Sequence, residues 1–146
     1  MQLSMTGEYA LRAMLYISSR PFGSAFQISE IAEKNEIPEN FLRKIIPQLK
    51  KASILNSQRG NGGGISLMKN AELITPLEII EAVEGPISLN KCLIHSKFCS
   101  REDYCSFHIL WSDAQQQLKS MLASRNLKEL AEKNSENILT LKIIQN

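Results

Sequence analysis

The chain of 146 residues lacks any apolar run long enough to cross a membrane, because its longest apolar runs are short and interrupted by charge. It also lacks the features of a secretory signal, since Glu8 and Arg12 fall within the N-terminal segment that would have to be apolar. We therefore expect no membrane partner and a cytoplasmic location.

No catalytic constellation is visible either. Serine, histidine and carboxylate residues do not form a recognisable motif. No Gly-Lys-Ser/Thr follows the glycine-rich segment 60–64, which excludes a nucleotide-binding phosphate loop. The single tryptophan, Trp111, is expected in the core and not as a substrate platform. The sequence therefore predicts that the protein is not an enzyme.

Acidic residues are absent from residues 41–69, although this stretch carries six basic ones. Its first half has apolar residues at helical spacing, and its second half has two short runs, 54–58 and 65–68, around four glycines, which predicts a hairpin. The chain up to Asn70 has a net charge of +4 and the remainder a net charge of −2. The basic half is therefore the candidate surface for a polyanion.

A helix-turn-helix is predicted just before this hairpin. A short helix over about 29–35 is followed by a turn at 35–37, and Pro38 then suits the first position of a third, basic helix. Pro47 is expected to kink that helix, because proline removes a backbone donor. A basic helix followed by a basic hairpin is typical of a winged helix-turn-helix, in which the helix enters the major groove and the hairpin flanks the phosphates.

Eight residues of this stretch are the candidate DNA contacts. The third helix is expected to contact the groove, and the hairpin to hold phosphates or reach the minor groove, with Gly60 allowing close approach of the backbone. The predicted DNA-binding residues are Arg43, Lys44, Gln48, Lys50, Lys51, Arg59, Gly60 and Asn61.

The remaining elements are predicted from capping and periodicity. A first helix over about 7–20 is capped by Ser4 or Thr6, and Thr75 with Glu78 forms a capping box for a helix that Gly85 ends. Residues 87–92 are expected to be extended. A long helix begins at 106, a shorter one covers about 127–133, and the tail from 136 packs as a strand or an added helix or stays partly disordered. The apolar stripe of the long helix has nothing in the chain to cover it, which suggests a partner copy.

Cysteine is scarce, and the number of cysteines, three, is odd. In a cytoplasmic chain this argues against a disulfide framework and favours metal ligation or a reactive thiol. Cys92, Cys99 and Cys105 lie in a polar loop that is short enough to wrap around one metal centre, although the C-x-x-C knuckle of structural zinc sites is missing. Three soft ligands with one harder ligand suit an iron–sulfur cluster.

The fourth ligand has three candidates. His108 lies three residues past Cys105, His95 lies inside the loop, and Glu8 at the N-terminus would reach the centre from elsewhere, even from a second subunit. For each of them a surface or capping role is the simpler alternative, so the residues alone leave the fourth ligand open.

Together these patterns predict a mainly α fold with a small β-hairpin wing. Residues 1–85 are expected to form the winged helix-turn-helix DNA-binding domain and residues 86–108 the cysteine-containing cluster-binding loop. Residues 106–146 are expected to form the long dimerisation helix and the C-terminal tail.

The chain resembles the family of bacterial winged-helix transcriptional regulators that includes IscR, NsrR and RirA. The motifs that carry the resemblance are LSMTGEYALRAMLYIS, ISEIAEKNEIPENFLRKIIPQL, SQRGNGGGISLMK, ITPLEIIEAVEG and the cysteine loop closing into CSFHILW. The resemblance implies a homodimer on a near-palindromic operator of double-stranded DNA. It also implies an iron–sulfur cluster, 2Fe–2S in preference to 4Fe–4S. His108 matches the histidine ligand of some members, and Glu8 matches the acidic residue that ligates across the dimer in others.

The leading hypothesis is therefore a dimeric DNA-binding regulator that senses iron, redox state or nitric oxide through its cluster. A second hypothesis keeps DNA binding and places zinc or a thiol switch on the three cysteines. A third is a small iron–sulfur carrier or redox enzyme without DNA function, which the basic stretch argues against.

Overall fold

The computed structural model describes residues 2–95 and 97–145. Its described part is mainly helical with one antiparallel hairpin, which confirms the predicted fold class. The α-helices and strands are α1 (Met5–Ser18), α2 (Ile28–Lys34), α3 (Glu39–Lys51), β1 (Leu55–Gln58), β2 (Gly64–Leu67), α4 (Pro76–Glu84), α5 (Ser106–Ala123) and α6 (Leu127–Ile144). Three short 3₁₀ turns join them, η1 (Ala71–Leu73), η2 (Lys91–Leu93) and η3 (Glu102–Tyr104).

One core unites α1 to α4 with the hairpin. The buried side of α3 consists of Leu42, Ile45, Ile46 and Leu49, the spacing of one helical face. The two strands pair from Leu55 opposite Leu67 to Gln58 opposite Gly64. The core is apolar throughout its described part, and its largest fully buried side chains include Met14, Ile31, Leu42, Ile45, Leu49, Ile54, Leu55, Ile74 and Ile79.

Local chemistry explains where the elements begin. α1 begins at Met5, two residues earlier than predicted, because the Ser4 side chain accepts a hydrogen bond from the Gly7 N–H. α3 begins one residue after Pro38 and runs on to Lys51 through Pro47, whose exposed ring lies away from the buried stripe. Thr75 and Glu78 form the predicted capping box of α4.

Two predictions about the second half of the chain were wrong in extent. The extended segment predicted over 87–92 ends at Asn90, which is extended, because Lys91 and Cys92 lie in η2. The helix predicted over 127–133 continues to Ile144, so the tail forms part of α6. The described residues offer no free strand with which the tail could pair, and helical hydrogen bonds satisfy the backbone groups of the tail instead.

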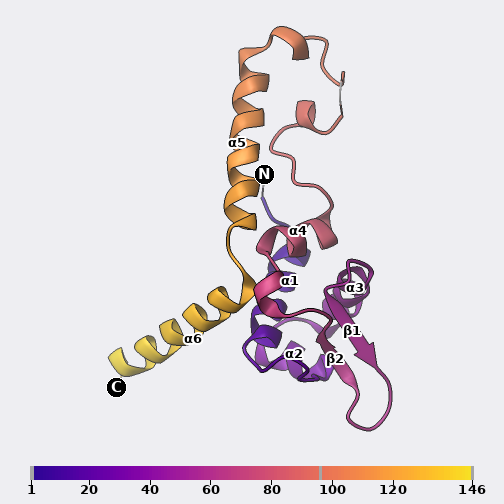
Figure 1. Ribbon diagram of the computed structural model, residues 1–146, viewed down its shortest axis with the longest axis vertical. Helices are drawn as coiled ribbons and strands as arrows, with labels where there is room; N and C mark the ends of the chain where they lie inside the picture. The colour runs from indigo at the N-terminus through magenta and orange to yellow at the C-terminus, as the bar shows by residue number, and fades with distance from the viewer. Residues whose placement is uncertain (1, 96, 146) are drawn as a thin grey trace.

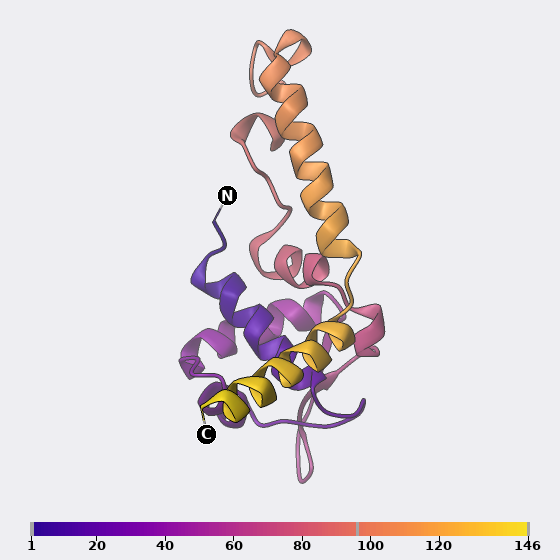
Figure 2. The same cartoon turned by 90° about the vertical axis from the view of Figure 1, so that its left-hand side faces the viewer.

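The long helix α5 extends away from the winged domain. The segment that holds the cysteines runs from α4 alongside α5 to the far end of that helix, where α5 begins (Figures 1 and 2). α6 then starts beside α1, and its C-terminal end extends away from the winged domain (Figure 1). None of the 18 residues of α5 is buried, and Trp111 is 39% exposed, so the prediction that it lies in the core was wrong within one chain. No helix in the described residues has the length and apolar character needed to cross a membrane.

Candidate nucleic-acid interface and metal-binding loop

The side of α3 opposite its buried stripe carries the predicted groove contacts. Because Leu42, Ile45 and Leu49 are held in the core, the side chains between them point outward. The structure accordingly exposes Arg43, Lys44, Gln48, Lys50 and Lys51.

The wing is fixed to the domain at its base and near its tip. The Lys50 ammonium at the end of α3 donates a hydrogen bond to the Ser57 hydroxyl of β1. Phe26 pairs with Ile65 as an isolated antiparallel bridge, and the Gln27 side-chain amide donates to the Gly63 carbonyl at 2.8 Å. These contacts hold a wing whose tip residues Arg59, Gly60 and Asn61 are all exposed.

A hollow of about 470 Å³ lies between α3 and the wing. Its lining residues are Ile28, Arg43, Ile46, Pro47, Lys50, Ser57 and Ile65. Two of these side chains, Arg43 and Lys50, are cationic, so the hollow has positive charge at its edge. A concave basic surface of this kind suits the convex sugar-phosphate backbone of a duplex.

Two of the basic side chains have acidic partners that sequence reasoning overlooked. Arg43 pairs with Glu39 four residues earlier, a spacing that places the two side chains on one helical face. Lys69 pairs with Glu78 of α4. An exposed pair like the first contributes only about 0.3–0.5 kcal/mol, so Arg43 can exchange Glu39 for a phosphate or base at little cost.

The cysteine loop spreads its three thiols over three local structures. Cys92 lies in η2, Cys99 precedes η3, and Cys105 is the N-cap of α5. All three are free and half-buried. Within residues 2–95 and 97–145, no group of three or more histidine, cysteine or acidic side chains is close enough to hold a metal ion. This conformation therefore does not bring the predicted ligands together.

His108 is placed in the first turn of α5, next to Cys105. Its Nε2 lies 3.9 Å from the Glu102 carboxylate. Its Nδ1 is buried and has no hydrogen-bond partner among the described residues. A buried polar atom left without a partner costs about 1–3 kcal/mol, which points to a missing partner at this nitrogen.

The other two candidates for the fourth ligand lie elsewhere. His95 is exposed in the loop. Glu8 is exposed in the first turn of α1, at the winged domain, whereas the loop around Cys99 and Cys105 lies at the far end of α5 (Figure 1). Within one chain, Glu8 is therefore not a neighbour of these two cysteines.

The donor set fits an iron–sulfur cluster in its chemistry. Three thiols and one imidazole are soft and intermediate ligands of the kind that iron–sulfur clusters use. The buried Nδ1 of His108 is available for a bond that residues 2–95 and 97–145 do not supply. Anionic centres are also favoured at the N-terminus of α5, where Cys105 lies.

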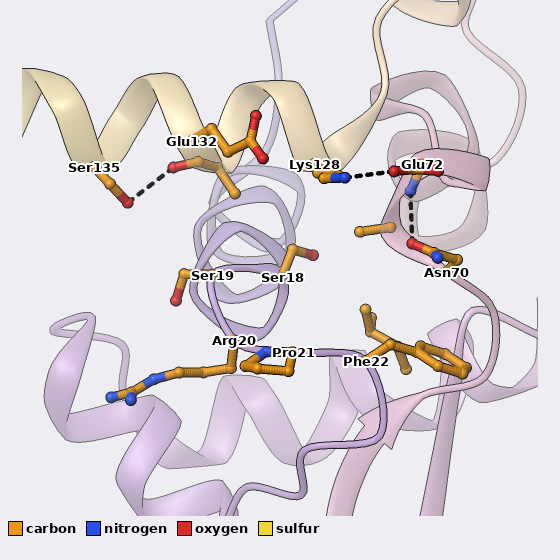
Figure 3. A pocket seen from close by; sticks show the side chains of 13 residues that line it. Ser18, Ser19, Arg20, Pro21, Phe22, Asn70, Glu72, Lys128, Glu132 and Ser135 are labelled. Atoms are coloured by element: carbon orange, nitrogen blue, oxygen red, sulfur yellow. Dashed lines mark hydrogen bonds and ion pairs between the residues drawn. The ribbon is translucent and has the colours of Figure 1, made fainter.

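The junction between the winged domain and α6 surrounds a second hollow, of about 410 Å³ (Figure 3). Lys128 of α6 donates to Glu72 of η1 across it, and the Leu127 N–H donates to the Ile74 carbonyl at 2.8 Å. Leu67 of the wing strand β2 also lines it. α6 is thus fastened to η1, the turn that follows strand β2 in the chain.

Comparisons with known proteins agree with this geometry. Residues 3–133 match the family described as "Rrf2: Iron-dependent Transcriptional regulator". The chain is 32% identical over 136 residues to the HTH-type transcriptional regulator IscR of Xenorhabdus nematophila, which covers 93% of this chain and 82% of that relative.

Solved structures show the same fold. CymR, the global cysteine regulator of B. subtilis, matches with a TM-score of 0.74 at 28% identity, over 91% of this chain and 98% of that chain. IscR of T. potens matches with a TM-score of 0.75 at 23% identity, over 94% and 90% of the two chains, and this likeness is one of fold alone.

Proposed function

Because the chain belongs to the Rrf2 family of transcriptional regulators, we propose that it binds a near-palindromic operator as a homodimer and senses iron, redox state or nitric oxide through an iron–sulfur cluster. Membership of the family makes it a DNA-binding regulator of transcription and not an enzyme. A protein that acts on the chromosome works in the cytoplasm, which is where we place it.

DNA contact is assigned to the exposed side of α3 and to the tip of the wing. Arg43, Lys44 and Gln48 would contact base edges or phosphates in the major groove. Contacts with phosphates or the minor groove are assigned to Lys50, Lys51, Arg59 and Asn61. Gly60, which has no side chain, would let the protein backbone approach the DNA closely. The hollow between α3 and the wing, with two cations at its edge, supports this assignment.

Dimerisation is assigned to α5. Large apolar side chains along this helix are more than half exposed in the single chain, namely Phe107, Ile109, Leu110 and Met121. Exposed apolar surface concentrated on one long helix is a typical interface with another copy. A two-fold dimer would place two copies of α3 at a fixed spacing, and a palindromic operator is recognised through that spacing.

The cluster would be held by Cys92, Cys99, Cys105 and His108, with Glu8 of a second subunit as the alternative fourth ligand. The single observation that supports this best is the buried Nδ1 of His108, three residues after Cys105, which has no hydrogen-bond partner in the described part of the chain. When bound, the group supplies a centre whose oxidation or loss is chemically easy. Loop 92–105 has to close for the thiols to meet, and α5 and α6 then connect that rearrangement to η1, the turn after β2.

Anaerobic purification with a visible spectrum tests the cluster. We expect a coloured protein with about two iron and two sulfide atoms per subunit, as a 2Fe–2S cluster requires. A colourless protein without iron and sulfide contradicts the proposal. Zinc in that protein would favour the alternative of a zinc site, and a metal-free protein with reactive thiols would favour the thiol switch.

Two matched variants identify the fourth ligand. His108→Ala should lose most of the cluster, and Glu8→Ala should keep it. The reverse pattern would assign the fourth position to Glu8 of the partner copy. His95→Ala serves as the control for losing an exposed imidazole from the same loop.

A further inference from the structure

The Glu102 carboxylate joins two parts of the cysteine loop. Its Oε2 accepts a hydrogen bond from the Lys97 backbone N–H at 2.6 Å. Lys97 adopts a left-handed backbone conformation with φ +67°, which few residues other than glycine take without support. Glu102 therefore helps to hold the turn between Cys92 and Cys99.

The other oxygen of the same carboxylate faces His108. Oε1 of Glu102 lies 3.9 Å from Nε2 of His108, and the two side chains are only 22% and 20% exposed. The opposite ring nitrogen, Nδ1, is buried without a partner among the described residues. One nitrogen of the imidazole thus faces an anion, while the other is free.

This arrangement has a known chemical use. A histidine that binds a metal donates its other ring N–H to a carboxylate or carbonyl, which fixes the tautomer and the orientation of the ring. A carboxylate beside Nε2 favours the proton on that nitrogen. The lone pair then resides on Nδ1, the nitrogen that lacks a partner.

We propose that Glu102 is a positioning residue, which holds the proton of His108 on Nε2 so that Nδ1 presents its lone pair to the iron–sulfur cluster. The same carboxylate anchors the turn at Lys97, so it links the orientation of the histidine to the path of the loop between the cysteines. The cluster part of this inference rests on the proposed function. The pairing of Glu102 with His108 is a property of the protein without its cluster.

The pairing is tested first in the cluster-free, full-length protein. The chain has two histidines, so a ¹⁵N-histidine-labelled sample gives two sets of ring signals, which His95→Ala assigns. In its neutral form, His108 should show the Nε2–H tautomer with a proton that exchanges slowly with water. Glu102→Ala should lose that protected proton, whereas Asp103→Ala, an exposed neighbour, should keep it.

The role toward the cluster is tested in the anaerobic, cluster-loaded protein. Glu102→Gln should weaken retention of the cluster against a chelator by roughly 10- to 100-fold, the usual loss of metal affinity when such a partner is removed. It should also raise the reduction potential, because the imidazole becomes a poorer donor. Asp103→Asn removes the same charge from the same loop and should leave both quantities close to those of the wild type.

The outcomes separate this inference from the proposed function. A wild-type protein that never holds a cluster contradicts the proposed function, and the histidine spectra still decide whether Glu102 pairs with His108. A cluster whose stability and potential are the same in wild type and Glu102→Gln overturns the positioning role alone. An Nδ1–H tautomer in the wild type, or an unchanged His108 signal in Glu102→Ala, overturns the pairing itself.

Discussion

Individual side chains decide how strongly the basic face can hold a polyanion. Arg43 and Lys50 both have partners in the free protein, Glu39 and Ser57. Within the described residues, Lys44, Lys51 and Arg59 have no ion pair, so their charge is fully available. We therefore expect Arg59, at the tip of the wing, to contribute directly to DNA affinity.

Arg59→Ala should weaken binding by a similar factor on all sequences, because a phosphate contact carries no base information. The slope of log affinity against log salt should become shallower by about 1. Fluorescence anisotropy over a salt series measures both effects. Lys142→Ala removes the same charge in the last turn of α6, whose end lies on the other side of the molecule from the wing (Figure 1), and should change neither. Equal effects of the two variants would exclude a wing contact.

The approach of the wing to Phe26 depends on Gly64. A Cβ at this position would lie 2.6 Å from the Phe26 carbonyl oxygen, and the residue has φ +146°. Gly60 also has a positive φ, +99°, but a Cβ there meets nothing within 4 Å. Comparing a substitution at Gly64 with one at Gly60 therefore separates the effect of a steric clash from the effect of backbone strain.

Gly64→Ala should lower the melting temperature measured by circular dichroism more than Gly60→Ala does. Strain alone costs about 1–3 kcal/mol at such positions, and the clash with Phe26 adds to it only at Gly64. Equal melting temperatures for the two variants would show that the bridge between Phe26 and Ile65 tolerates a side chain.

Sequence reasoning placed the exposed basic residues correctly because each depends only on helical or hairpin periodicity. It did not predict the contact of Lys50 with Ser57 or that of Glu102 with His108. Both contacts depend on how a helix packs against a strand or loop that is not at helical spacing from it. The ion pair of Glu39 with Arg43 could have been predicted from the sequence, because the two residues are four apart, the ordinary spacing of an ion pair on a helix.

Among the elements, α4 is the one whose start was predicted in most detail. Thr75, Pro76 and Glu78 define it through local hydrogen bonds, and local chemistry is what a sequence reports best. The extent of α6 was not foreseen. Its second half, from Asn134, packs little against the rest of the chain, so no amphipathic signal marked its end.

The capping box makes the stability of α4 dependent on pH. Burial opposes ionisation of Glu78, but hydrogen bonds from Lys69 and from the Thr75 backbone outweigh it and lower the pKa of Glu78 below its ordinary value of 4.5. A carboxyl whose pKa is lowered by folding stabilises the protein above its ordinary pKa. That stabilisation is lost as the pH falls through the pKa of the folded state.

Glu78→Gln should therefore show a smaller loss of melting temperature than the wild type when the pH is lowered from 6 to about 3. Near pH 6 the variant should melt lower, because the charged partner of Lys69 is gone. Glu136→Gln, on the exposed surface of α6, is the control and should follow the wild-type curve. Parallel curves for the wild type and Glu78→Gln would contradict the role of this carboxylate.

At the scale of the whole molecule, α5 is the element on which the oligomeric state and the path of any signal depend. A helix of 18 residues with none buried gains little stability from packing within a single chain. It separates the winged domain from the cysteine loop (Figure 1), so any signal from that loop has to pass along it or through a partner copy.

Leu110→Glu should shift the protein from dimer to monomer at micromolar concentration, because it places a charge in the proposed interface. Analytical ultracentrifugation measures the change. Ser112→Glu adds the same charge about 200° around α5, on its polar side, and should leave the dimer intact. A dimer that survives Leu110→Glu but not Ser112→Glu would place the interface on the other side of the helix.

The coupling of the reading helices to the cysteine loop is tested most directly by DNA affinity measured before and after cluster removal. An operator selected from a random duplex library is titrated with one anaerobic preparation, first loaded and then stripped by a chelator. The account predicts a change of at least about tenfold, in the usual range of allosteric coupling, and no such change in Cys99→Ser. Equal affinities for loaded and stripped protein would contradict it.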